Sequence, residues 1–171
     1  MDILELGSSS YRLDRAREAD LPALVALLAD DPLGSTRETA DPEPYRAAFH
    51  AIDADRDHHL LLTVRALESD GEPVVATLQL TLLPGLSRGG ATRLQLEGVR
   101  VDREWRGTGL GAALLAWSHR WGWERGARLG QLTSDAARPG AHRFYESVGY
   151  VASHVGFKRD LSGAAAGRRP R

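Results

Sequence analysis

The sequence of 171 residues contains no cysteine and a single methionine. Without cysteine the protein cannot form disulfide bonds, thiolate metal sites or a covalent intermediate on a cysteine nucleophile. No segment reaches the roughly 20 consecutive apolar residues of a membrane-spanning helix. The first ten residues, MDILELGSSS, are acidic where a signal peptide is basic. We therefore expect a cytoplasmic protein that has no membrane partner.

Charge is also scarce on balance, because the formal net charge is only −1. No basic surplus points to nucleic acid, so the expected partner is a small molecule. With 42% hydrophobic and 26% charged residues, the chain has the composition of one globular domain. We place this domain at 1–161 and predict that the small, basic tail 162–171 is disordered.

The N-terminal third predicts a short strand and two helices. The strand covers Tyr11–Arg17, and the first helix follows a cap by Asp20, with Pro22 in its first turn. The segment 30–44 contains Pro, Gly and acidic residues and is predicted to be a loop. A second helix is expected from Pro44 onward.

Three strands should follow. His59–Ala66 and Val74–Leu83 are rich in β-branched and leucine residues and flank the turn sequence SDGEP, which predicts an antiparallel hairpin. In the third run, RLQLEGVRV at 93–101, the apolar alternation slips by one residue at Glu97-Gly98. Such a slip at a glycine indicates a β-bulge, although two short strands would leave the same pattern.

The C-terminal half predicts alternating elements. In order, these are a helix over 109–125, a strand over 127–134, a short helix over 141–147 and a last strand or strand pair over 150–161. Trp117 and Trp121 share the apolar stripe of the long helix and should be core residues. A helix between two strands of one sheet makes those strands parallel. The fold class is therefore α/β, with a mixed sheet of six to seven strands, a bulged central strand and about four helices on both faces.

One segment carries clear chemical information, because glycines join the end of a strand to the start of the long helix. It consists of Arg106, Gly107, Thr108, Gly109, Leu110 and Gly111. Glycines allow a ligand to approach the backbone, and the first-turn N–H groups with the helix dipole attract an anion such as pyrophosphate. No Lys-Ser/Thr pair follows, and the spacing is not G-x-G-x-x-G, which weakens the kinase and dinucleotide interpretations.

Two motifs together resemble those of a known family. Segment 106–111 reads R-x-x-G-x-G, and segment 141–150 reads A-x-x-x-Y-x-x-x-G-Y. Both resemble the signatures of the GNAT superfamily of N-acetyltransferases, and the element order fits over 11–161. The resemblance implies an acyl-CoA N-acyltransferase fold with acetyl-CoA as cosubstrate. It also makes a homodimer possible.

The resemblance implies a cofactor site as well. Backbone groups of Val99, Arg100 and Val101 would bind the pantetheine arm, in a slot that the bulge opens, and the N–H groups of 106–111 would bind the pyrophosphate. The Arg106 side chain either adds its charge to the phosphates or is exposed to solvent. The sequence departs from the family at Arg138, where many members have an asparagine. Arg138 either reaches a phosphate or points to solvent. Thr133 and Ser134 are candidates to replace the missing polar contacts.

For catalysis, the attacking amine must lose a proton and the leaving thiolate must gain one. Glu97, beside the bulge, is the candidate base, although a strand glutamate can also be a plain surface residue. Tyr145 matches the second motif and is the candidate acid, although a lone helical tyrosine often only packs. Without a cysteine or a serine triad we predict direct transfer in a ternary complex and no metal. His142 is more typical of a helix surface than of a site.

The acceptor is expected to be an amine of a small molecule or a peptide. Four acidic residues of the loop would suit a cationic amine or would simply be solvated: Asp30, Asp31, Glu38 and Asp41. The alternative function is a non-catalytic module that binds CoA as a sensor or pairs with a partner protein.

Overall fold

The structure of the protein is a computed structural model that describes residues 2–30 and 34–161. The chain divides into two compact units, Met1–Leu132 and Thr133–Arg171, and each is described by itself. The predicted tail, 162–171, lies outside the described residues. A single domain over 1–161 stays a prediction.

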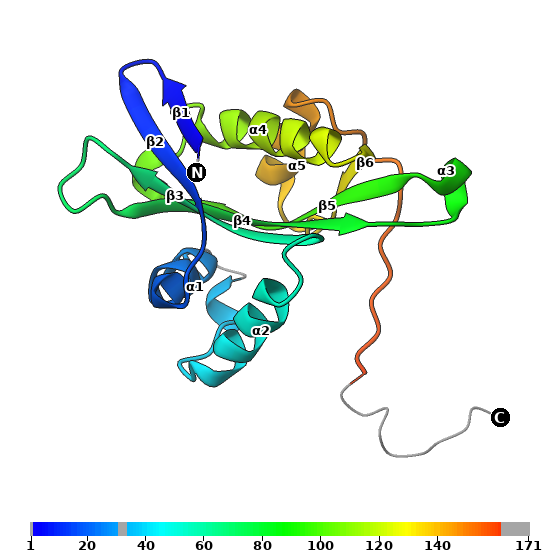
Figure 1. Ribbon diagram of the computed structural model, residues 1–171, viewed down its shortest axis with the longest axis horizontal. Coiled ribbons are helices and arrows are strands. Elements are labelled where there is room, and N and C mark those ends of the chain that lie inside the picture. Colours follow the sequence, from blue (N-terminus) through cyan, green and yellow to red (C-terminus); the bar gives the residue numbers. More distant parts are fainter. Residues whose placement is uncertain (1, 31–33, 162–171) are drawn as a thin grey trace. The chain divides into compact units, whose positions relative to one another are not determined.

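The first unit contains one sheet of six strands in sequence order (Figure 1). The strands are β1 Asp2–Leu6, β2 Ser9–Arg15, β3 His59–Ala66, β4 Val74–Leu83, β5 Thr92–Val101 and β6 Ala127–Leu132. Neighbouring strands are antiparallel except β5 and β6, which are parallel. The mixed sheet, the hairpin and the parallel βαβ connection are as the sequence predicts.

Strand β1 was not predicted. It pairs with β2 from Asp2↔Leu13 to Leu6↔Ser9, so a two-residue turn at Gly7-Ser8 closes the hairpin. Gly7 has φ +63°, the left-handed conformation that such turns need and that glycine tolerates. The dipeptide Gly-Ser between two short runs is a sequence signal for this hairpin.

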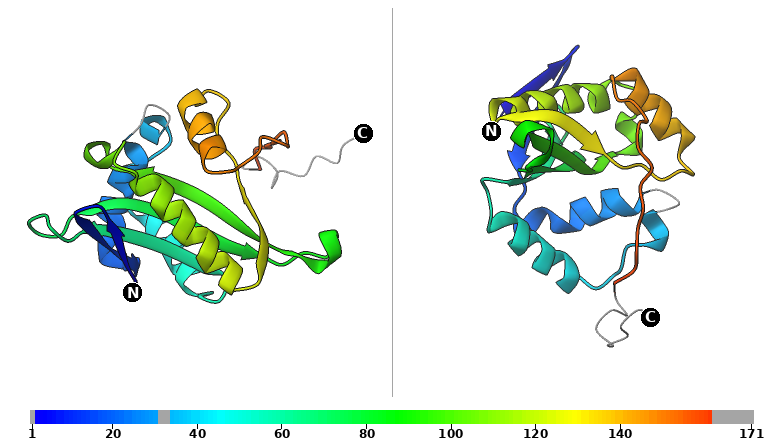
Figure 2. Two further views of the ribbon diagram at one scale, coloured as in Figure 1. Left: turned by 90° about the horizontal axis from the view of Figure 1, so that it is seen from above. Right: turned by 90° about the vertical axis from the view of Figure 1, so that its right-hand side faces the viewer.

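Helices cover both faces of the sheet, as Figure 2 shows. In the first unit they are α1 Leu21–Ala29, α2 Glu43–Asp53, α3 Ser87–Gly90 and α4 Leu110–Glu124, with single 3-10 turns at Glu18–Asp20, Gly34–Thr36 and Arg103–Trp105. Helices α1 and α2 pack on one face, against β3, β4 and β5, whereas α4 packs on the other, against β5 and β6. The short α3 lies in the connection between β4 and β5.

Helix α4 contributes much of the core on its side of the sheet. Its buried side chains include both predicted tryptophans, Trp117 and Trp121. At Gly122 the helix touches β5 so closely that an added Cβ would lie 2.7 Å from Leu94 Cδ2. Gly126, with φ +86°, ends the helix as its N–H bonds to the Trp123 carbonyl at 3.0 Å.

The predicted β-bulge is present in β5. The partners of Thr77 and Gln79 are Arg100 and Glu97, so three steps on β5 oppose two on β4. Gly98, inside the bulge, has φ +58°, a conformation that is costly for any residue with a side chain. The slip in the apolar pattern therefore reflects a bulge within one strand and does not mark two short strands.

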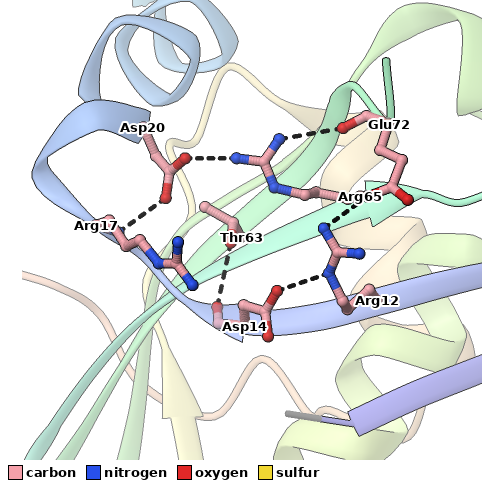
Figure 3. A network of polar contacts seen from close by, with 7 residues as sticks. All are labelled: Arg12, Asp14, Arg17, Asp20, Thr63, Arg65 and Glu72. Carbon is pink, nitrogen blue, oxygen red and sulfur yellow. Dashed lines mark hydrogen bonds and ion pairs between the residues drawn. The ribbon is translucent and has the colours of Figure 1, made fainter. Parts of the chain in front are cut away.

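The start of α1 differs from the prediction. The Asp20 side chain does not cap α1. Instead its two oxygens accept bonds from the Arg17 backbone N–H at 2.8 Å and from Arg65 of β3 at 2.5 Å (Figure 3). Arg65 also donates to the Glu72 carbonyl at 3.1 Å. The helix start is therefore tied to the sheet and to the β3–β4 turn.

Within 133–161, the second unit contains one helix, α5 Pro139–Ser147, which includes the predicted helix over 141–147. The strand predicted over 150–161 is wrong, because none of these residues is in a strand. Its apolar side chains are exposed, Phe157 to 93%, and the N–H of Ser153 bonds locally to the Val151 carbonyl. A strand needs a ladder of bonds to a partner, which the apolar pattern alone does not provide. No helix within the described ranges is long and apolar enough to span a membrane.

Candidate active site

The bulge of β5 separates a paired part of the strand from an open part. Pairing with β6 runs from Thr92 to Leu96. From Glu97 to Val101, the described residues of the first unit provide no strand partner on that side. This edge of β5 therefore lacks a neighbouring strand, but the Val99 and Val101 carbonyls accept hydrogen bonds from the Arg100 and Arg106 side chains at 2.9 and 2.8 Å. Binding of a pantetheine arm by residues 99–101, which the family resemblance implies, stays a prediction.

Glu97 and Arg100 lie on the same face of the sheet. Their partners, Gln79 and Thr77, are two residues apart on β4 and therefore share a face. Leu96 precedes Glu97 and must face the other way. Because Leu96 and Leu94 share the α4 side of the sheet, Glu97 is on the α1 side, where it is exposed. Without the bulge, residues three apart would point to opposite faces.

The segment from β5 to α4 forms a compact turn. Asp102 N–H bonds to the Val75 carbonyl at 2.8 Å, and the Asp102 carboxylate accepts from Glu104 N–H at 2.9 Å. The Thr108 hydroxyl donates to the Trp105 carbonyl at 2.7 Å. The first of these bonds connects the start of the loop to β4, and the other two lie within the loop.

The start of α4 has the features of an anion site. Gly107 and Gly109 have φ of +79° and +91°, which only glycine adopts readily, and the space beside Gly107 is open. The first-turn N–H groups of the helix, from Leu110 and Gly111 onward, have no partner within the helix. This is the geometry with which helix N-termini bind phosphate.

The side chain of Arg106 turns away from this turn of glycines and is already engaged. Its Nε donates to the Val101 carbonyl at 2.8 Å. Its Nη2 lies 2.8 Å from the carboxylate of Asp30, at the end of α1, and 3.3 Å from the Asp30 carbonyl. Arg103 binds the other oxygen of the same carboxylate. The hydrogen bond from Arg103 lowers the pKa of Asp30, against the effect of burial, so the carboxylate is ionised at neutral pH.

The second unit holds the remaining predicted residues. Thr133 is exposed directly after β6, and Arg138 stands at the start of α5, half-buried. Ser134 Oγ is buried with no hydrogen-bond partner among the described residues, so its hydroxyl is left for a water or a ligand. The His142 ring contacts the Asp135 carbonyl at 2.8 Å, so its Nε2 carries a proton.

Tyr145 lies half-buried on α5 beside a second phenol. Its ring packs edge-on against Tyr150 with centroids 5.9 Å apart, and the Tyr150 N–H bonds to the Tyr145 carbonyl at 3.0 Å. Burial, with a smaller effect from Tyr145, raises the pKa of Tyr150 to about 12. Tyr150 therefore keeps its proton throughout the physiological pH range.

Comparison with known proteins decides the family. Residues 21–150 match the sequence profile of the Acetyltransferase (GNAT) family, which spans both motifs and the bulged strand. The chain belongs to the GNAT family. It is an acetyl-CoA-dependent N-acetyltransferase.

Individual GNAT relatives agree with this assignment. The aminoalkylphosphonate N-acetyltransferase of Salmonella typhimurium is 29% identical over 87% of this chain and 90% of its own length. A solved structure from Bacillus halodurans, named a transcriptional regulator, is 40% identical with a TM-score of 0.80, covering 88% of this chain and 99% of that one. A putative acetyltransferase from Agrobacterium tumefaciens is 26% identical with a TM-score of 0.72, covering 87% and 99%.

In this GNAT enzyme, three of the four acidic residues of the loop bond to neighbouring groups. Asp30 binds two arginines, Glu38 accepts the Tyr45 hydroxyl at 2.7 Å, and the Asp41 carboxylate accepts the Glu43 N–H at 3.1 Å. The fourth acid, Asp31, lies outside the described residues. The three described carboxylates therefore help to organise the chain around α1 and α2, and attraction of a cationic acceptor by this loop stays a prediction.

Sequence reasoning missed the link between Asp30 and the segment that follows β5. Asp30 was considered only as a loop acid, and Arg103 was not considered. These partners are 73 and 76 residues apart in sequence, a separation at which no local periodicity connects two residues. No local signal in the sequence indicated this pairing, because Arg103 already has two acidic neighbours in the chain, Asp102 and Glu104.

Proposed function

We propose that this enzyme transfers the acetyl group of acetyl-CoA to the primary amine of a small molecule, by direct attack in a ternary complex. The observation that carries the proposal is the bulge, which leaves the edge of β5 open from Glu97 onward and directs the exposed Glu97 carboxylate to the α1 side of the sheet. Strand β5 would thereby provide both the backbone groups that bind the cofactor and the carboxylate that acts as the base.

The proposed base is Glu97. An alkyl amine has a pKa of about 10.4 and is mostly protonated at neutral pH, so its lone pair must be freed before it can attack. The Glu97 carboxylate accepts that proton, directly or through one water. The nitrogen then bonds to the acetyl carbonyl carbon, the carbon–sulfur bond breaks with its electron pair on sulfur, and the nitrogen loses its second proton to solvent to give the neutral amide. Backbone N–H groups near Val99 stabilise charge on the carbonyl oxygen.

The proposed acid is Tyr145, which gives its phenolic proton to the departing sulfur. A phenol with a pKa of about 10 can protonate a thiolate whose conjugate acid has a pKa near 8.5. Burial raises the pKa of its neighbour Tyr150 to about 12, above that of an ordinary phenol, which makes Tyr150 a poor donor. The two tyrosines therefore form a natural pair of test and control positions.

The cofactor site follows from the backbone. Residues 99–101 would bind the pantetheine arm. Of the N–H groups of 106–111, that of Arg106 bonds to the Arg103 carbonyl at 3.4 Å, so those of 107–111 would bind the pyrophosphate, with the glycine conformations and the open space at Gly107 in support. Ser134 and Thr133 are proposed to add hydroxyl contacts, with the buried, unbonded Ser134 Oγ as the stronger candidate. Arg138 is retained as a candidate phosphate ligand.

For the acceptor, we favour small-molecule amines over protein lysines. The Salmonella relative is named for aminoalkylphosphonates, which combine an amine with an anionic group. This class belongs in any acceptor panel, beside polyamines, amino sugars and lysine peptides.

The test is thiol release from acetyl-CoA with such a panel, for the wild type, Glu97→Gln, Tyr145→Phe and Tyr150→Phe. We expect release to require an amine, Tyr145→Phe and Glu97→Gln to lower kcat by about 10² to 10⁴, and Tyr150→Phe to stay near wild type. Equal loss in both tyrosine variants would reject Tyr145 as the specific acid.

A second candidate is a regulatory role beside acetyl transfer. One observation favours it, since the 40% identical Bacillus halodurans protein is named a transcriptional regulator. Thiol release that occurs only with a protein acceptor, and with no small amine of the panel, would support this role over the first.

A further inference from the structure

The segment between β5 and α4 is joined to a distant part of the chain through one carboxylate. Arg103 and Arg106 both leave this segment and bind Asp30, one to each carboxylate oxygen. Asp30 follows the last residue of α1, so the bonds connect the end of α1 to the glycine turn. We name these three residues the Asp30 clamp.

The geometry of the clamp fixes Arg106 in particular. One side of its guanidinium donates to the Val101 carbonyl, at the end of β5, and Nη2 donates to Asp30. Arg106 is thereby held between a strand and a helix and lies one residue before Gly107. The Asp30 side chain is only 17% exposed, whereas the two arginines are 50% and 73% exposed. The largely buried Asp30 carboxylate thus binds two exposed guanidinium groups.

We propose that Asp30 is a positioning residue that holds the glycine turn in its anion-binding conformation. In this proposal the Arg106 side chain stabilises the turn through Val101 and Asp30 and does not bind phosphate. This inference rests on the proposed binding of pyrophosphate at 107–111. Ordering the turn before the cofactor arrives lowers the entropy lost on binding. The clamp should therefore set the KM for acetyl-CoA. It should leave kcat nearly unchanged, because the pyrophosphate is remote from the reacting atoms.

An electrostatic role and a positioning role of Asp30 predict opposite changes in the affinity for acetyl-CoA when Asp30 is replaced by Asn. The substitution removes a negative charge beside an anion site, so a purely electrostatic role predicts tighter binding of acetyl-CoA. A positioning role predicts weaker binding, because the clamp loses its ionic partner and the turn loosens. We expect the KM for acetyl-CoA to rise about tenfold, with kcat within about twofold. An unchanged or lower KM would overturn the proposal.

A matched control is available on α2. Glu43 pairs with Arg46 at 2.6 Å in an exposed ion pair, so Glu43→Gln removes the same kind of interaction away from the glycine turn. We expect Glu43→Gln to leave the KM unchanged. A double-mutant cycle of Asp30→Asn with Arg106→Gln should be non-additive, because both changes break one contact. Additive effects in that cycle would contradict the clamp.

Amide hydrogen exchange separates this inference from the proposed function. In the absence of CoA, residues 101–112 should exchange faster in Asp30→Asn than in the wild type, and exchange in α2 should be unchanged. Unchanged exchange at 101–112 overturns the clamp even if the KM rises. If the wild type fails to bind CoA in calorimetry, the proposed cofactor site is wrong, whereas CoA binding of equal strength in wild type and Asp30→Asn rejects the clamp alone.

Discussion

Each end of α1 is fixed by an aspartate that binds arginine, and we call these two ion-pair contacts the N-terminal joint (Asp20 with Arg65) and the C-terminal joint (the Asp30 clamp). The two joints differ in how far their side chains are buried. At the N-terminal end, the side chains of Asp20 and Arg65 are 11% and 24% exposed. At the C-terminal end, the arginines that bind Asp30 are mostly open to solvent. The first joint lies between elements of the fold, and the second lies beside the proposed cofactor turn.

The N-terminal joint is also part of a larger network (Figure 3). Arg12 bridges Asp14 at 2.9 Å and Glu72 at 2.7 Å, and Thr63 donates to the Asp14 carbonyl at 3.2 Å. Glu72 has φ +45°, an uncommon conformation for a residue with a side chain, and both its carboxylate and its carbonyl are bound by arginines. Several partners thus share the desolvation cost of each charge, which makes this joint a structural one.

The largest expected effect is on stability, from Asp20→Asn. This change leaves the Arg65 guanidinium without its ionic partner in a largely buried place, and we expect a loss of about 2–3 kcal/mol. Urea denaturation of wild type and variant measures it. Arg46→Gln, in the exposed pair on α2, serves as the control and should shift the midpoint little. A loss in Asp20→Asn no larger than in this control would remove the contrast between the joints.

The middle of α1 provides the next prediction. Gly98 lies beneath the helix, where an added Cβ would be 3.6 Å from Leu28 Cδ2, and its φ is +58°. The space tolerates a methyl group, so the cost of Gly98→Ala comes from the left-handed backbone, about 1–2 kcal/mol. If the bulge relaxes to relieve that strain, Glu97 changes face, and kcat falls with stability. Thiol release and urea denaturation together test this, and a stable variant with wild-type kcat would show that the bulge needs no glycine.

The sequence predicted those parts of the molecule that depend on neighbours along the chain. The bounds of β3 and β4 follow from long apolar runs, and the bulge at Gly98 from a slip in alternation. The glycine turn was predictable because its glycines indicate a backbone conformation that other residues rarely adopt. In each case the information lies within about ten residues, where pattern and backbone preference agree.

Features set by distant partners were not predictable in the same way. Asp20 had a plausible local role as a helix cap, but Arg65, 45 residues away, binds its carboxylate instead. The apolar segment 150–161 resembled a strand because periodicity does not report whether a partner exists. Neither pattern specifies which charged groups meet in space, which is why the Asp30 clamp was also missed.

At the C-terminal joint the effect on stability should be small, because exposed ion pairs contribute little. We expect Asp30→Asn to leave the urea midpoint close to that of the wild type, in contrast to Asp20→Asn, while the KM for acetyl-CoA rises. Exposed guanidinia remain hydrated when the carboxylate is lost, which is the physical reason for the difference. A fall in stability as large as that of Asp20→Asn would show that both joints are structural.

The smallest expected effect is the pH dependence of the Asp30 clamp. An aspartate in an unfolded chain has a pKa of about 3.9, and the hydrogen bond from Arg103 lowers the pKa of Asp30 in the folded protein. A lowered pKa means that the contribution of the clamp is fully present above the unfolded value and is lost only as the pH falls through the folded value. The ratio of CoA dissociation constants, Asp30→Asn over wild type, should therefore be constant from about pH 8 down to about pH 5. Calorimetry across that range measures the ratio, and titration of CoA itself cancels. A ratio that falls toward one between pH 6 and pH 5 would mean that the carboxyl group gains its proton there, which a carboxylate bound by two arginines should not do.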